Sequence, residues 1–229
     1  MKRNVRMEDI SDGKLYTAND LVKADCGDCE GCSACCRGMG SSIVLDPLDI
    51  YRLTTGLGVR FEQLLSDKIE LNVVDGIILP NLKMGDEKEC CAFLNEEGRC
   101  SIHGIRPGIC RLFPLGRFYE DGGFKYFLQI HECKKENRTK VKVKKWIDTP
   151  DLKKYESFIS KWHYFLLELQ EKLLRIEEEK IKKINMFFLQ SFFLEPYKAE
   201  EDFYEQFDHR MKKVKQYLQT IFESYLDKR

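Results

Sequence analysis

The sequence contains no apolar stretch that resembles a secretory signal or a membrane-spanning helix. Its first residues, MKRNVRMEDISDGKLY, carry charges throughout, and no later segment approaches the roughly 20 apolar residues that span a bilayer. The chain has no excess charge of one sign either, because 38 Lys and Arg residues balance 38 Asp and Glu residues. These absences predict a cytoplasmic protein that does not enter a membrane and is not built wholly to coat nucleic acid.

Several signatures of catalysis are missing as well. No GxGxxG follows an expected strand and no GxxxxGK[ST] occurs, so neither a dinucleotide fold nor a phosphate-binding loop has a local signature. No three cysteines have the CxxxCxxC order of enzymes that make radicals from S-adenosylmethionine. The sequence therefore names no catalytic residue.

Cysteine, by contrast, is abundant. The chain has ten cysteines in 229 residues, and the run CGDCEGCSACC from Cys26 to Cys36 holds five of them. An apolar content of 43% can supply a core without disulfides, and glutathione keeps cytoplasmic thiols reduced. Two sulfurs of a CxxC turn can reach one ion. The pattern therefore favours metal-binding thiolates over disulfides.

The composition changes after Cys133, the last cysteine. Residues 1–133 hold 16 Lys and Arg against 21 Asp and Glu, whereas residues 134–229 hold 22 against 17. We therefore expect an N-terminal extension over 1–19, a cysteine-cluster domain over 20–148 and a helical C-terminal domain over 149–229.

The predicted fold class of the first part is α+β, a small cysteine-rich domain with short helices and hairpins. A helix should begin at Asp46-Pro47 and end at Thr55-Gly56, and a shorter one should cover 60–66. Two hairpins are expected, one with its turn at Asp75-Gly76 and one with its turn at Asp121 to Gly123.

The second part is predicted to be an antiparallel helical bundle. Its first helix starts near Thr149-Pro150-Asp151, and apolar residues then recur at steps of three and four from Phe158 to Leu173. Further helices are expected over roughly 180–194 and 200–226. We interpret the aromatic run FFLQSFF as core rather than as a partner groove.

At this point the motifs resemble a known family. The run Cys29-x-x-Cys32-x-x-Cys35-Cys36, then DPLDIYRL, then CAFLNEEGRCSIHGIRPGICRLFP, is similar to the YkgJ-type cysteine-cluster proteins, a family of zinc- or iron-chelating domains related to the flagellin lysine N-methylases. The resemblance covers roughly residues 26–133 and leaves the helical tail unexplained.

Carried across position by position, the resemblance implies a set of metal ligands, with Cys133 as its less strongly supported eighth member: Cys29, Cys32, Cys35, Cys36, Cys91, Cys100, Cys110 and Cys133. Cys26 and Cys90 depart from the family pattern. Each is read either as a spare ligand or as a small buried apolar residue.

Arg106 and Arg111 lie within four residues of matched cysteines, in the block RPGICRLFP. We expect both to donate hydrogen bonds to cluster sulfur rather than to form ordinary surface salt bridges.

Thiolates suit zinc and iron–sulfur clusters alike, and eight of them could close two zinc sites, two four-iron clusters or one cluster with spare cysteines. The relation to the methylases, which are held to carry a four-iron cluster, favours a 4Fe-4S cluster, with Zn²⁺ as the alternative.

The function implied is an iron–sulfur protein that is redox-active or supports protein lysine methylation. The alternative is a zinc-stabilised binding module whose helical tail engages a protein partner. The basic run KKENRTKVKVKK at 134–145 attracts phosphates in principle, but we interpret it as a solvated linker or edge strand rather than as a nucleic-acid site.

Overall fold

The computed structural model describes residues 6–27, 29–30, 32–85 and 89–226, and its architecture is α+β. The elements of the first half are α1 (Met7–Ile10), β1 (Leu21–Asp25), η1 (Ala34–Cys36), α2 (Pro47–Leu57), α3 (Phe61–Leu64), β2 (Ile69–Val74) and β3 (Ile77–Leu82). They are followed by η2 (His103–Ile105), α4 (Gly108–Leu112), β4 (Leu115–Glu120), β5 (Gly123–Leu128), β6 (Thr139–Lys142), α5 (Val143–Ile147), α6 (Leu152–Leu173), α7 (Glu178–Leu189), η3 (Gln190–Leu194) and α8 (Phe203–Leu226).

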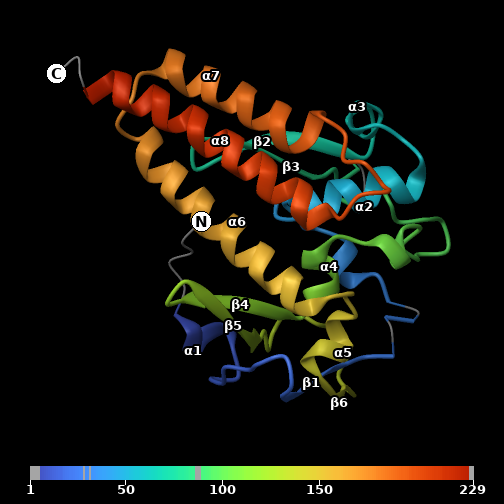
Figure 1. Ribbon diagram of the computed structural model, residues 1–229. Helices are drawn as coiled ribbons and strands as arrows, with labels where there is room; N and C mark the ends of the chain where they lie inside the picture. The colour runs from blue at the N-terminus through green and yellow to red at the C-terminus, as the bar shows by residue number, and fades with distance from the viewer. Residues whose placement is uncertain (1–5, 28, 31, 86–88, 227–229) are drawn as a thin grey trace.

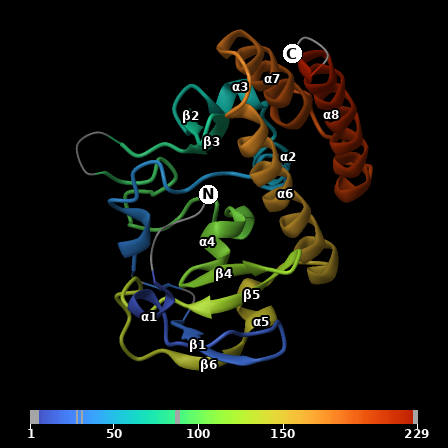
Figure 2. The same ribbon diagram turned by 90° about the vertical axis from the view of Figure 1, so that its left-hand side faces the viewer.

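The strands form separate two-stranded antiparallel sheets, β1 with β6, β2 with β3, and β4 with β5. Helix α6 runs from the α7–α8 pair at one end of the molecule to the β4–β5 hairpin at the other (Figures 1 and 2). Because β6 pairs with β1, the basic segment after Cys133 returns to the strand that precedes the cysteine run.

Both predicted hairpins are present. Asp75 and Gly76 have φ of 52° and 83°, and Asp121 and Gly122 have φ of 49° and 75°. Two successive residues with positive φ make the tight turn that matches the twist of a hairpin. The second turn therefore ends at Gly122 rather than at Gly123, which is the first residue of β5.

Helix α2 begins as its sequence predicts and ends later. A side-chain oxygen of Asp46 accepts the Asp49 N–H, and Pro47 occupies the first turn. The helix continues through Gly56 to Leu57 because Gly58, with φ of 66°, provides the left-handed cap. Gly56 instead permits a close approach, since a side chain there would overlap Ile105 of η2.

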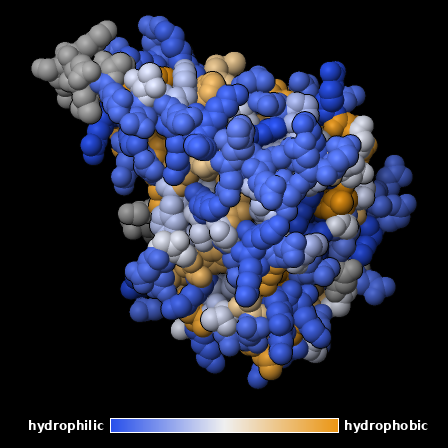
Figure 3. Space-filling model, viewed as in Figure 1, coloured by the Kyte–Doolittle hydropathy of each residue, from blue (hydrophilic) through white to orange (hydrophobic). Residues whose placement is uncertain are grey.

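The helical region packs around aromatic side chains. Trp162 of α6 lies 5.6 Å from Phe188 and 5.0 Å from Phe192, measured between ring centroids. Phe188, Phe192 and Phe193 are buried, so three of the four phenylalanines in the aromatic run belong to the core as expected, and the partly buried Phe187 packs against Tyr217. The face in Figure 3 is mainly hydrophilic with scattered apolar spots. Among the described residues, no helix is both long and apolar enough to cross a membrane.

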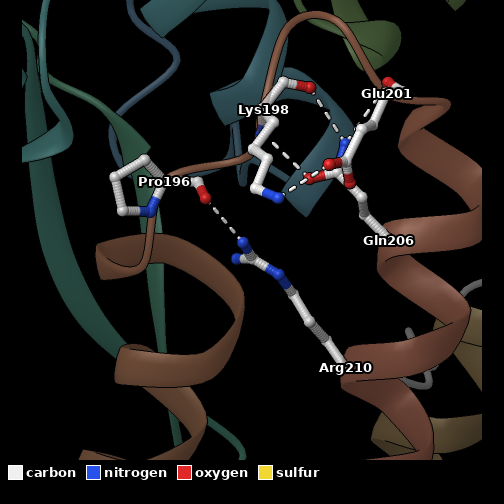
Figure 4. A network of polar contacts seen from close by, with 5 residues as sticks. All are labelled: Pro196, Lys198, Glu201, Gln206 and Arg210. Atoms are coloured by element: carbon white, nitrogen blue, oxygen red, sulfur yellow. Dashed lines mark hydrogen bonds and ion pairs between the residues drawn. The ribbon is translucent and has the colours of Figure 1, made fainter.

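The buried side chain of Arg210 forms hydrogen bonds with the backbone at the end of η3. Arg210 of α8 donates to the carbonyls of Ser191, Glu195 and Pro196 at 3.0, 2.6 and 2.7 Å, and its guanidinium lies 3.7 Å from the centre of the Tyr197 ring. Figure 4 shows Arg210 beneath the turn at Pro196, and nearby the Gln206 side chain forms hydrogen bonds with the Lys198 backbone. Arg210 thus donates to carbonyls at the end of the helix, where intrahelical donors run out.

Asn185 of α7 joins the helical region to the β2–β3 hairpin. Its side-chain oxygen accepts the Ile78 N–H at 2.8 Å, and its amide nitrogen donates to the Gly76 carbonyl at 3.0 Å. Asn185 is itself buried, so the turn carbonyl of Gly76 and the Ile78 N–H of β3 both depend on this one side chain.

Replacing Asn185 with Ala should therefore lower the free energy of unfolding by about 2–4 kcal/mol, because two backbone groups lose their partners. Chemical denaturation of the full chain measures this loss. Met186→Ala, one residue along the same helix at an exposed position, is the matched control and should change stability by less than about 0.5 kcal/mol. Equal losses in the two variants would contradict the role of Asn185.

Candidate metal centre

The thiols come from chain segments that the backbone holds side by side. The Cys91 N–H donates to the Cys36 carbonyl at 2.8 Å, and the Gly38 N–H donates to the Glu89 carbonyl at 2.9 Å. Residues 36–38 therefore lie against residues 89–91, where the blue and green parts of the ribbon run close together in Figure 2. Cys100 is held beside the residues that follow Cys91 by an antiparallel backbone β-bridge to Leu94.

Cys110 is brought to the other thiols by α4, which a carboxylate of α2 holds in place. Asp49 accepts the Gly108 N–H at 2.7 Å while its second oxygen accepts the Asp46 N–H. A side chain at Gly108 would overlap the Tyr155 hydroxyl of α6, so glycine allows α4 to pack closely there. Sequence reasoning missed this function of Asp49, because its partner lies 59 residues away.

The described residues include all ten cysteines, and none of them forms a disulfide. Seven thiol residues line one cavity of about 220 Å³: Cys29, Cys32, Cys35, Cys36, Cys91, Cys100 and Cys110. A smaller cavity of about 20 Å³ adjoins it and is lined by Cys26, Cys29, Cys32, Cys35 and Cys133. Each predicted ligand thus lines one cavity or both, whereas Cys90 lines neither.

Four of these thiols form the cluster that we call the tetrad: Cys36, Cys91, Cys100 and Cys110. They line the larger cavity and not the smaller one. In each of the six possible pairs, one thiol lies near enough to the other to oppose its ionisation. The fold thus brings four soft sulfur donors from three segments to one place.

Burial keeps most of these sulfurs protonated in the absence of a cation. Burial raises the pKa of Cys91 to about 11, and it also raises the pKa values of Cys100 and Cys110. Cys36 differs, because a hydrogen bond from the Cys35 thiol lowers its pKa to about 7, with help from the charges of Arg106 and Arg37. Cys36 is therefore the thiol of the tetrad that ionises most readily.

Arg106 supplies positive charge to the larger cavity, which it lines. Its Nη1 lies 2.9 Å from His103 Nε2, and its charge favours the ionised forms of Cys29, Cys36 and Cys100. The buried Arg106 Nε has no hydrogen-bond acceptor among the described residues. An unused donor beside several thiols suits an anionic, sulfur-rich group.

Arg111 is placed differently. Its guanidinium donates to the carbonyls of Gly104 and Asp148, and it lines neither thiol cavity. It therefore ties η2 to the end of α5, and the hydrogen bond to sulfur expected from the sequence stays a prediction.

Two further residues at the cavities escaped sequence reasoning. Trp146 of α5 lines both cavities and donates from its indole to the Phe113 carbonyl at 3.1 Å. Arg99 lines the larger one and donates to the Cys29 carbonyl at 3.0 Å. The position of Arg99 directly before Cys100 was a usable signal, whereas nothing in the sequence linked Trp146 to the thiols.

The chemistry of the donor set fits zinc or iron, because thiolates bind both. In the part of the chain that the structure describes, no three His, Cys, Asp or Glu side chains already stand in a coordinating arrangement. Rotation about the Cα–Cβ bond moves a cysteine sulfur between staggered positions without moving the backbone. Loading thus requires the thiols to turn and lose protons together.

The acidic pair beside α4 has its own pH response. Burial raises the pKa of Asp46 to about 8, and the nearby Asp49 carboxylate adds to this rise. The folded protein therefore holds a proton that the unfolded chain releases near pH 4. Stability from this group is full below that pH and declines as the pH rises toward 8.

Replacing Asp46 with Asn removes this titration and leaves an oxygen to accept the Asp49 N–H. Between pH 5 and pH 8 the metal-free parent should lose up to about 1.4 kcal/mol of stability per pH unit relative to Asp46→Asn. Thermal unfolding of both proteins at several pH values measures the difference. If the stabilities of the two proteins changed with pH in the same way, Asp46 would already be ionised in the folded parent, and the prediction would be wrong.

A comparison with protein families adds to this geometry. The model of the CxxCxxCC family, described as "Putative zinc- or iron-chelating domain", matches residues 28–147. No curated protein and no solved structure matches the chain. The matched span contains all of the tetrad and stops before α6, and the kinship with the flagellin lysine N-methylases stays a prediction.

Proposed function

Because this chain belongs to the CxxCxxCC family of zinc- or iron-chelating domains, we propose that it is a redox-active iron–sulfur protein whose tetrad holds a 4Fe-4S cluster. The observation that carries the proposal is the grouping of Cys36, Cys91, Cys100 and Cys110 on a cavity of about 220 Å³. Four cysteine thiolates are the usual ligands of such a cluster.

The size and polarity of the cavity support iron–sulfur rather than a single ion. A cavity needs roughly 10–15 Å³ to accept one water-sized probe, so about 220 Å³ leaves room for a polynuclear group. The unused Arg106 Nε donor suits a group with sulfur atoms of its own. When bound, a 4Fe-4S cluster supplies one-electron transfer at a potential set by its surroundings.

The residues of the chain have distinct tasks in this proposal. The tetrad sulfurs bind, and Asp49 positions Cys110 through the Gly108 N–H. Trp146 and Phe113 give part of the cavity wall an aromatic surface. Arg106 offsets the negative charge of the thiolates and of the sulfide that they hold.

Anaerobic purification of the full chain tests the proposal. We expect about four iron and four sulfide ions per chain, together with broad visible absorption. Cys100→Ala and Cys110→Ala, from different segments, should each lose most of both ions, because each removes one tetrad ligand.

Cys90→Ala is the matched control, because Cys90 is next to Cys91 but lines neither cavity, and it should keep its iron and sulfide. A colourless parent with stoichiometric zinc and no sulfide would overturn the iron–sulfur assignment. It would favour the zinc-stabilised module that binds a protein partner.

Arg106 should also set the reduction potential. Its positive charge stabilises the more negative reduced state, so Arg106→Gln should lower the midpoint potential by tens of millivolts. A redox titration followed by electron paramagnetic resonance measures this shift. Arg111→Gln is the control, because Arg111 contacts carbonyls outside the cavities, and its shift should be much smaller. Equal shifts would contradict the assignment of Arg106.

A further inference from the structure

The small cavity beside the tetrad calls for its own explanation. It is lined by Cys26, Cys29, Cys32, Cys35 and Cys133, and two of these, Cys26 and Cys133, are absent from the larger cavity. We propose that Cys26, Cys29, Cys32 and Cys133 form a second metal site, which holds one tetrahedral Zn²⁺ ion. This inference rests on the proposed function in one respect, because it requires that the cluster held by the tetrad leaves these four thiols free to bind another ion.

The spacing of the first two sulfurs fits a single ion. Cys26 Sγ and Cys29 Sγ lie 3.6 Å apart. Two sulfurs at about 2.3 Å from one tetrahedral zinc ion are about 3.8 Å apart by simple geometry. In a four-iron cluster each cysteine binds a different iron, so its thiolates lie farther from one another. Cys26 and Cys29 are therefore spaced as ligands of one ion.

The size of the cavity leads to the same conclusion. A volume of about 20 Å³ exceeds the roughly 10–15 Å³ taken by one water-sized probe and leaves no room for a polynuclear cluster. The two cavities differ about tenfold in volume while sharing a wall of cysteines. One suits a cluster and the other suits an ion.

The backbone at Gly27, Cys29 and Cys32 is held in tight turns. Gly27 has φ of 67° and Cys29 has φ of 59°, and the Cys32 N–H donates to the Cys29 carbonyl at 3.0 Å. A positive φ is uncommon outside glycine and is kept where surrounding contacts enforce it. Arg99 provides one such contact by donating to the Cys29 carbonyl.

Cys133 reaches this turn because two cross-links bring its segment there. Lys135 Nζ donates to the Glu30 carbonyl at 3.0 Å, and Thr139 Oγ1 donates to Asp25 Oδ2 at 3.2 Å. Cys133 and Cys29 line the same small cavity. Sulfurs from both ends of the cysteine-rich region thus meet at one cavity.

The charges around the small cavity suit a thiolate zinc site. Four thiolates and one Zn²⁺ leave a net charge of about −2. The charged residues that line the cavity are Lys134, Lys135 and Glu132, so its wall carries an excess of one positive charge. Cys26 is a departure from the family pattern, so the resemblance does not account for it. The ion would fasten the β1 end to the segment after β5 and would stabilise the folded state.

The test measures zinc and iron in the same samples of the full chain, produced with both metals and purified without oxygen. The parent should hold about one zinc ion in addition to its iron. The double variant Cys26→Ser with Cys133→Ser should lose at least nine tenths of the zinc and keep its iron, sulfide and colour. Cys100→Ala should show the reverse pattern, and Cys90→Ser should keep both metals.

Zinc content that is unchanged in the double variant would overturn the second site, as would loss of iron together with zinc. The parent could instead hold two zinc ions and no iron, and the double variant one zinc ion. That result would overturn the iron–sulfur assignment and support the second site.

X-ray absorption at the zinc edge of the parent tests the site without any substitution. Four sulfur neighbours at about 2.3 Å are expected. Oxygen or nitrogen neighbours, or a parent without zinc, would overturn the site even where the double variant fails to fold.

Discussion

The structure depends on gathering thiols in a place where they cannot all be charged. Four thiolates around one cavity would repel one another, and burial makes each charge costly. The tetrad avoids this cost by staying largely protonated, as the raised pKa values of Cys91 and Cys110 indicate. A bound cation reverses the balance, because it replaces the protons and neutralises the sulfurs. The low pKa of Cys36 makes this residue the natural first ligand.

The rest of the fold keeps these neutral thiols near one another. The segments that carry them contain few helical or ladder hydrogen bonds, so their positions are imposed by neighbouring elements. Asp49 fixes α4 to α2, Arg111 fixes η2 to the end of α5, and the β1–β6 pair closes the chain beyond Cys133. The helical region reaches the same centre through α6, whose Tyr155 packs against Gly108 and accepts a hydrogen bond from Arg117.

Local features of the fold were predictable because their causes are local. Asp46-Pro47 begins α2, Asp75-Gly76 forms a hairpin turn, and the apolar stripe from Phe158 to Leu173 faces the core. Features that depend on distant partners were not predictable. The close packing of Gly56 against Ile105 required the position of η2, and the carbonyl partners of Arg111 required the position of α5. The spacing of cysteines predicted metal binding, but it could not assign thiols to two cavities, because Cys29, Cys32 and Cys35 line both.

The central claim is that Cys36, Cys91, Cys100 and Cys110 converge on one bound metal group. Anomalous diffraction at the iron edge, from crystals of the anaerobically purified full chain, tests it most directly. We expect an iron signal enclosed by the four Sγ atoms of the tetrad. Iron located elsewhere, or electron density that joins tetrad sulfurs into disulfides with no metal between them, would contradict it.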